Sequence, residues 1–122
     1  WIISIITILG SSIALMNIML VSVTERTREI GVRKALGAKN ATISTQFFIE
    51  TIVIGQIGSV LGIILGILTG LAFSSFFESE FSLPWIPMIW ATIITFVVAI
   101  IAGFYPAMKA SKLDPIESLR YE

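Results

Sequence analysis

The chain contains no cysteine and no histidine, and only 13% of its 122 residues are charged. Without these two residue types it has no thiol redox centre, no Cys or His metal site and no catalytic triad. A soluble domain of this size carries roughly a quarter charged residues, because its surface faces water. Much of the surface of this chain must therefore face something other than water.

Ionisable side chains are missing from three long stretches, residues 1–24, 51–77 and 81–108. Each is at least as long as the roughly 20 apolar residues that cross a hydrocarbon core of about 30 Å. Membrane strands are shorter, about 9–11 residues, and alternate apolar with polar side chains, which these stretches do not. The sequence therefore predicts an all-α membrane bundle with three transmembrane helices. Because the chain opens on Trp1, without the basic start of a signal peptide, we expect it to be a piece of a longer parent.

The basic residues predict an orientation. All of them lie in segment 25–40 or in the tail 109–122, whereas the loop 78–83 carries only acidic charges. Lys and Arg stay on the cytoplasmic side of spans, so both basic segments are expected inside and the loop outside. A single domain is thus predicted with six segments: transmembrane 1–24, cytoplasmic 25–40, an interfacial start and transmembrane 41–77, extracytoplasmic 78–83, transmembrane 84–108 and cytoplasmic 109–122.

Small residues recur at every fourth position of the second and third spans. They are Gly58, Gly62, Gly66 and Gly70, and then Ala91, Thr95, Ala99, Gly103, Ala107 and Ser111. In lipid, helices associate by close packing, which small side chains permit. Two interpretations are open: self-association of identical chains through the glycines, or mutual packing of the two spans. The short connection between the spans favours the second.

Few polar residues fall inside the spans. Asn17 and Gln56 are expected to form interhelical hydrogen bonds, worth about 0.6 kcal/mol each. Glu50 is expected at the headgroup level, solvated or paired with a base of segment 25–40. The alternative is a buried carboxylate that holds the cytoplasmic ends together, since a charge at membrane depth is costly unless it is paired.

The basic segment 25–40, here called the elbow, contains Gly31 and Gly37. We expect the first span to continue to about Glu29 and to break at Gly31, because glycine costs a helix about 1 kcal/mol. A short helix over 32–36 should follow and end at Gly37. Asn40 can then cap the next helix.

This arrangement would expose an apolar knob of Val32 and Leu36, surrounded by Arg33, Lys34 and Lys39. Two glycines placed where a helix would start and stop favour an ordered elbow. The simpler interpretation is a positive-inside loop without an ordered helix.

A nucleotide site is excluded for the elbow. A phosphate loop needs glycine, four residues, Gly-Lys and then Ser or Thr, whereas Ala38 separates Gly37 from Lys39 and Asn40 follows. We expect no cofactor in this chain.

The tail "LDPIESLRYE" carries the signature of a helix start. Asp114 stands at the cap position, Pro115 at the first helical position and Glu117 three residues after the cap, which together form a capping box. A short cytoplasmic helix is predicted, with a frayed terminus as the alternative.

The strings "TERTREIGVRKALGA" and "YPAMKASKLDPIESLRYE", with the Gly-rich span between them, resemble the FtsX-like permease domain of MacB-type ABC transporters. The similarity covers essentially the whole chain. It implies a multi-pass protein of the bacterial inner membrane with four spans, a large extracytoplasmic domain and a second permease copy as dimer partner. It also implies an ABC ATPase, separate or fused, that docks on the elbow as a coupling helix. The docking residues would be Glu29, Ile30, Val32, Arg33, Lys34 and Leu36.

Three classes of function follow. The first is a permease or mechanotransmitter that couples ATP hydrolysis by a partner to export or extracytoplasmic work, with no catalysis of its own. The second is a small self-associating membrane scaffold without an ATPase partner. A channel or secondary transporter is the weakest, because the spans lack the ionisable pairs and broken helices of ion pathways. Membrane lipid and a possible extracytoplasmic protein are the further partners expected, and no nucleic acid is.

Overall fold

The computed structural model describes residues 2–77, 80–114 and 116. Within these residues the chain forms helices and no strand, so the predicted all-α class is confirmed. The helices are α1 (Ile2–Glu25), α2 (Thr27–Ala35), α3 (Asn40–Phe76) and α4 (Trp85–Ser111). Three of them, α1, α3 and α4, are long and apolar enough to cross a membrane, as the charge-free stretches predict.

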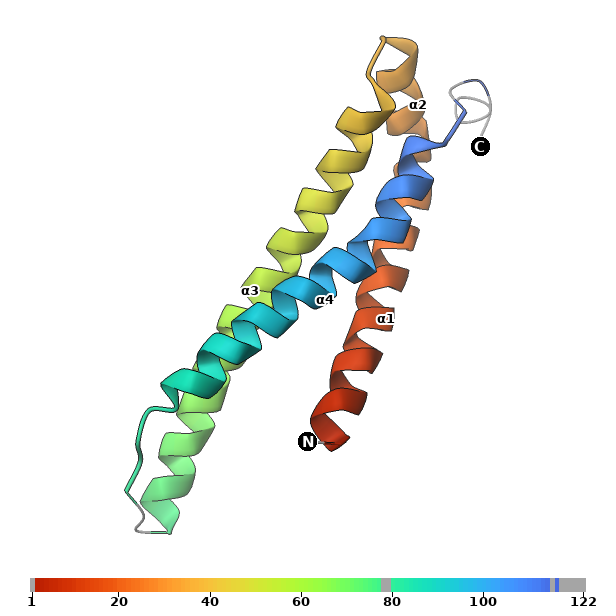
Figure 1. The fold of residues 1–122 in the computed structure, drawn as a ribbon. Helices are drawn as coiled ribbons and strands as arrows, with labels where there is room; N and C mark the ends of the chain where they lie inside the picture. Colours follow the sequence, from red (N-terminus) through yellow and green to blue (C-terminus); the bar gives the residue numbers. More distant parts are fainter. Residues whose placement is uncertain (1, 78–79, 115, 117–122) are drawn as a thin grey trace.

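The central helix of the bundle is α4. It runs antiparallel to α3 along most of its length and also packs against α1, whereas α1 and α3 barely touch (Figure 1). The predicted mutual packing of the second and third spans is therefore confirmed. Away from α2, the helices α1 and α3 diverge.

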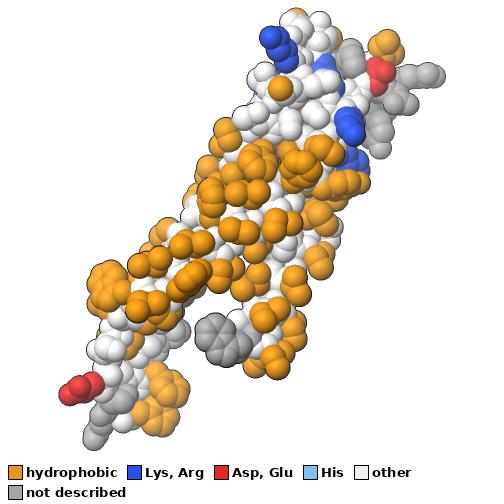
Figure 2. Space-filling view, in the orientation of Figure 1, with side chains coloured by type: hydrophobic (Ala, Val, Ile, Leu, Met, Phe, Trp, Pro, Cys, Tyr) orange, Lys and Arg blue, Asp and Glu red, His pale blue; other side chains and the backbone are white. Residues whose placement is uncertain are grey.

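The packed core lies at the end of the bundle that carries α2, here called the α2 end. Its buried members are Met19, Val23, Ile30, Ile43, Phe47, Ala107 and Ala110, which come from all the helices. Elsewhere the long helices expose large apolar side chains, and Figure 2 shows this apolar surface between basic residues at the α2 end and an acidic residue at the opposite end. Such a surface is suited to lipid rather than to water.

The contact between α3 and α4 uses small residues, but not all of those expected. A Cβ atom at Gly103 would lie 2.8 Å from the Cβ of Thr51, and one at Gly55 would lie 2.9 Å from the Cβ of Ala99. The assignment of Ala99 and Gly103 to helix packing is thus supported, and their partners on α3 are Thr51 and Gly55.

The predicted glycine stripe of α3 was wrong for this contact. A Cβ atom at Gly58, Gly62 or Gly66 would meet no described atom within 4 Å, and only Gly70 is covered, by the Phe81 ring of the loop. Because a residue three positions on lies about 300° around a helix, Gly58 is turned by about 60° from Gly55. Gly58, Gly62 and Gly66 are all exposed, so these three glycines do not form the close contact with α4.

The break between the first span and the elbow occurs earlier than expected. Helix α1 ends at Glu25, Arg26 is the turn residue with φ −96° and ψ 13°, and α2 passes through Gly31 without interruption. Thr27 Oγ1 donates to the carbonyls of Val23 and Thr24, which lie in the last turn of α1. Such side-chain bonds compete with the helical ladder. The predicted break at Gly31 and the separate helix over 32–36 were wrong, because Gly31 is buried and packing outweighs its low propensity.

In the turn after α2 the predicted role of Gly37 is confirmed, whereas the predicted role of Asn40 is not. Gly37 adopts φ +95°, the left-handed region that favours glycine, and ends the helix as predicted. Asn40 is the first residue of α3 rather than its cap. Lys39 holds the cap position in an extended conformation, with no side-chain hydrogen bond.

Candidate functional site

The candidate site is the elbow, which forms an ordered tip at the α2 end rather than a loose loop. One side of α2 faces the core, where Ile30 is only 2% exposed and Gly31 is buried. The other side is open: Val32 is 43% exposed and Leu36 is 84% exposed. Ile30 was predicted to be a docking residue. It belongs instead to the core, because a buried side chain cannot reach a partner.

The exposure of Leu36 is fixed by the turn that follows it. Gly37 N–H donates to the Lys34 carbonyl at 2.9 Å, and Ala38 N–H donates to the Arg33 carbonyl at 3.0 Å. These two bonds form a Schellman motif, in which the left-handed residue closes the helix end. Ala38 packs against the core cluster, so Leu36 is held at the apex.

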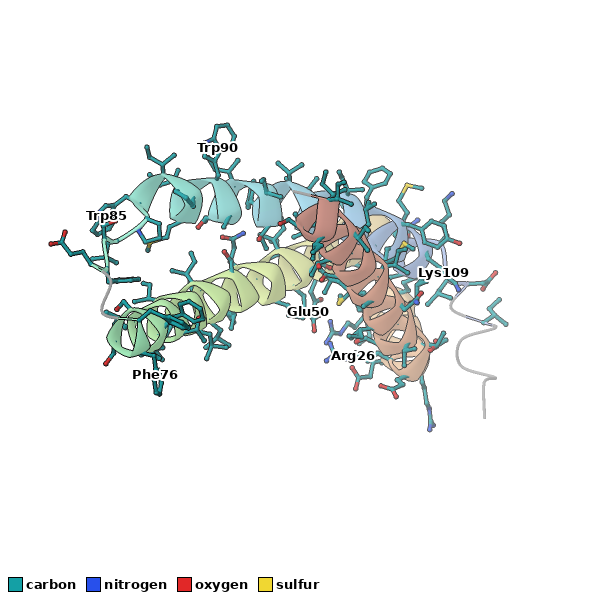
Figure 3. The ribbon with its side chains drawn as sticks, turned by 90° about the horizontal axis from the view of Figure 1, so that it is seen from below. Arg26, Glu50, Phe76, Trp85, Trp90 and Lys109 are labelled. Carbon is teal, nitrogen blue, oxygen red and sulfur yellow. The ribbon has the colours of Figure 1, made fainter. Side chains whose placement is uncertain are left out.

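The first polar contact between the elbow and α3 is an ion pair. Arg26 Nη1 lies 3.3 Å from both carboxylate oxygens of Glu50. Figure 3 labels the two residues, Arg26 in the turn before α2 and Glu50 on α3. Both are partly exposed, so the pair is not buried in the bundle. The expectation that Glu50 pairs with a base of the elbow is confirmed, and the buried alternative is not.

A second and a third contact engage the two charges that were expected to face a partner. Arg33 Nη1 donates to Gln46 Oε1 on α3 at 2.7 Å. Lys34 Nζ donates to the carbonyls of Ser111 and Leu113, each at 2.6 Å. Arg33 and Lys34 therefore hold the elbow on α3 and on the end of α4, while Glu29 is exposed.

Sequence reasoning missed Arg26, Gln46 and these backbone acceptors. Lys34 and Leu113 are 79 positions apart, and every residue has a carbonyl, so no pattern in the chain marks the contact. For Arg26 the sequence contained a weak signal, because it is one of the bases of the elbow that could pair with Glu50, the single carboxylate of the second span.

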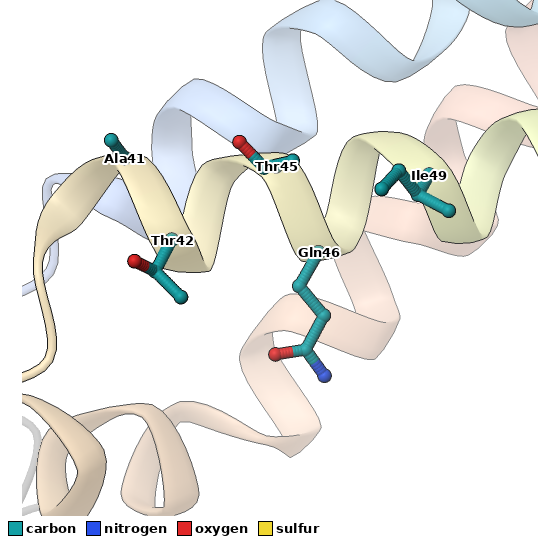
Figure 4. A pocket seen from close by; sticks show the side chains of 5 residues that line it. All are labelled: Ala41, Thr42, Thr45, Gln46 and Ile49. Carbon is teal, nitrogen blue, oxygen red and sulfur yellow. The ribbon is translucent and has the colours of Figure 1, made fainter.

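A shallow open groove lies on α3 beside the elbow (Figure 4). It is lined by Ala41, Thr42, Thr45, Gln46 and Ile49, which recur at intervals of three and four positions and therefore lie on one side of the helix. Its small apolar and hydroxyl side chains suit contact with a surface rather than bond-making chemistry. In the described ranges no group of three or more Asp and Glu could hold a metal ion.

The remaining predicted residues have mixed outcomes. Asp114 Oδ1 accepts a hydrogen bond from Ile116 N–H at 2.9 Å, as a cap residue would. Pro115, Glu117 and the predicted tail helix lie outside the described residues. Gln56 Nε2 is buried and finds no hydrogen-bond partner within the part of the chain that the structure describes. Its expected interhelical bond is therefore not formed here.

Comparison with known proteins gives a consistent set of similarities. The family described as FtsX-like permease C-terminal matches residues 1–115. The chain is 46% identical over 117 residues to the uncharacterized ABC transporter permease YknZ of Bacillus subtilis, covering 96% of this chain and 30% of that protein. It is 49% identical over 120 residues to the macrolide export ATP-binding/permease protein MacB of Vibrio parahaemolyticus, covering 96% of this chain and 18% of that protein. The chain thus spans less than a third of either relative.

Proposed function

Because the chain belongs to the FtsX-like permease C-terminal family, we propose that it is the membrane part of an ABC transporter permease that is driven by an ATPase. The ATPase is a partner chain or another part of the same protein, and the elbow is the surface on which it docks. The work done is export or movement of an extracytoplasmic partner, and the chain itself performs no catalysis.

The observation that supports this function best is the exposure of Leu36 on an ordered turn. Leu36 is 84% exposed, and it stands among charged residues, outside the charge-free stretches that lipid would cover. Because the turn already fixes the backbone at Leu36, binding of this side chain in a groove would cost little backbone entropy, which suits an anchor. Val32 is the second anchor, one turn before Leu36.

The charges around the two anchors would set the register of docking. Arg28, Glu29 and Lys39 are exposed, and charges at the rim of an interface contribute more to orientation and association rate than to affinity. Arg33 acts indirectly, by fixing the elbow on α3 through Gln46.

We place the α2 end on the cytoplasmic side of the bacterial inner membrane. All Lys and Arg of the sequence lie in the elbow or in the chain from Lys109 onward. Within the described residues the end of α4 lies beside the elbow, where Lys34 contacts Ser111 and Leu113. Positive residues beside spans remain in the cytoplasm, which is also where an ATPase finds its ATP. A second permease copy and an extracytoplasmic protein complete the proposed assembly.

The test is co-purification of the ATPase with the full-length permease. We expect Leu36→Ala to weaken docking by about 2 kcal/mol, roughly 30-fold in affinity, because a buried anchor is lost. Leu61→Ala is the matched control, since Leu61 is an exposed leucine of α3 within the apolar surface. It should insert and retain the ATPase as the parent does.

Arg33→Glu provides a second arm of the test. It removes the contact with Gln46 and reverses a charge at the elbow, so the ATPase should be lost while membrane insertion is unchanged. If Leu36→Ala and Arg33→Glu both insert and both retain the ATPase at the parent level, the elbow is only a positive-inside connection and the proposed docking is wrong.

A further inference from the structure

Lys34 connects the elbow to the last turn of the central helix. From this contact we propose that Lys34 is the positioning residue that transmits displacement of the elbow to α4, an inference that rests on the proposed function. Its Nζ donates to the carbonyls of Ser111 and Leu113, each at 2.6 Å. Ser111 is the last residue of α4, and Leu113 lies two residues beyond it.

The chemistry of this contact makes it a strong link. The last carbonyls of a helix have no intrahelical donor and carry the negative end of the helix dipole. A lysine ammonium satisfies them with charge-assisted hydrogen bonds, which are roughly twice as strong as neutral ones. The Lys34 side chain is partly buried, so water competes less for these bonds than at an open surface.

Packing beside Lys34 supports the same connection. Ile30, one turn before Lys34, is buried in one cluster with Ala107 and Ala110 of α4. The buried side of α2 and the last turns of α4 thus contribute to the same core, and Lys34 joins the two helices at their ends. Arg26 and Arg33 instead contact side chains of α3, so the polar contact with α4 depends on Lys34 among the described residues.

Helix α4 contains a position at which its end can move separately. Pro106 lies inside the helix and is buried. Proline has no N–H for the carbonyl four residues earlier and is a usual cause of a bend. Figure 1 shows α4 changing direction over its last turns, toward α2. Just before this position Gly103 rests closely on Thr51 of α3, so the contact can act as the pivot.

A displacement of Leu36 by a docked partner therefore has a defined route. Leu36 is two residues from Lys34, Lys34 holds the end of α4, and the Pro106 position lets that end turn about the contact with Thr51. The outer part of α4, from Trp85 onward, would change its angle to the α2 end.

The test uses spin-label pairs in the full-length permease, reconstituted in lipid vesicles with its ATPase. The chain has no cysteine. A cysteine pair introduced into this domain is therefore the only site of labelling once any cysteines elsewhere in the full-length permease are removed. One pair, Ile86→Cys with Lys109→Cys, reports the bend of α4. The other, Ala35→Cys with Lys109→Cys, reports the link across Lys34, and all three positions are exposed.

We expect the distance between positions 86 and 109 to differ between the nucleotide-free state and the state trapped with ATP and vanadate. The distance between 35 and 109 should stay the same. In Lys34→Met the first change should be lost while the ATPase still co-purifies. Lys112→Met is the matched control, because Lys112 is an exposed lysine just after α4 that lies outside the docking surface, and it should retain the change.

Two results would overturn the inference. One is a change between 86 and 109 in Lys34→Met equal to that of the parent. The other is a shift between 35 and 109 in the unsubstituted Lys34 background, a measurement that does not depend on whether Lys34→Met folds. If the unsubstituted permease itself fails to co-purify with its ATPase, the proposed function is contradicted instead. The two failures are therefore distinguishable.

Discussion

At the scale of single residues, Gly103 sets how closely α3 and α4 approach. A Cβ atom there would lie 2.8 Å from Thr51 Cβ and 2.9 Å from Thr51 Cγ2. Thr51 is fully buried, and its Oγ1 donates to the Phe47 carbonyl at 2.9 Å, so it cannot turn aside without losing a bond. The glycine is therefore required by space rather than by backbone conformation.

We expect Gly103→Ala to destabilise the bundle by about 1–3 kcal/mol, the usual cost of adding a methyl group to a packed contact. Thermal unfolding of the purified chain in detergent measures the effect. Gly62→Ala is the control, because a Cβ atom there meets no described atom within 4 Å and alanine favours a helix by about 1 kcal/mol. Equal melting temperatures for the two variants would show that the α3–α4 contact is not formed as described.

At the scale of elements, the turn between α2 and α3 gives the elbow its shape. Gly37 at φ +95° lets the two Schellman hydrogen bonds form, and these bonds hold Leu36 at the apex. The geometry of the docking surface therefore depends on a residue that contributes no side chain to it.

We expect Gly37→Ala to destabilise the turn by about 1–2 kcal/mol, because an L residue with a Cβ is strained in the left-handed region. Gly37→Asn is the milder control, since asparagine tolerates this region better than alanine. For both variants the measurements are the protease resistance of the elbow and the co-purification of the ATPase. A Gly37→Ala protein that resists protease better than Gly37→Asn would contradict this role of the turn.

At the scale of the whole molecule, the bundle is tightly packed at one end and open at the other. The buried cluster contains the ends of α1 and α4 and the start of α3, while the first turns of α1 are exposed. An apolar surface lies between the basic residues of the α2 end and an acidic residue at the opposite end (Figure 2). Movement of α4 relative to α1 meets least packing at the open end.

The proposed orientation predicts a labelling pattern. In intact cells a membrane-impermeant thiol reagent should react with Glu80→Cys and should not react with Lys39→Cys. Both side chains are exposed, so access differs only by the side of the membrane. After the cells are permeabilised Lys39→Cys should react as well. Reaction of Lys39→Cys in intact cells would reverse the orientation.

The sequence by itself determined the elements whose causes are local. Charge-free length specifies three spans, because a hydrocarbon core excludes ionisable groups. A glycine followed by a new helix start specifies the end of α2 at Gly37, since few other residues adopt its φ. The family resemblance also depended on contiguous residues, and the match over residues 1–115 agrees with it.

Only the tertiary structure decided which faces and side chains meet. A repeat of four in a helix of about 3.6 residues per turn drifts around the axis, so the glycine stripe of α3 did not reveal that Thr51 and Gly55 contact α4. The break at Arg26 involves the side-chain hydrogen bonds of Thr27, whereas α2 continues through Gly31 because that residue is buried. The acceptors of Lys34 are backbone carbonyls more than 70 residues away, which no local pattern can indicate, because their position depends on how the whole of α4 packs.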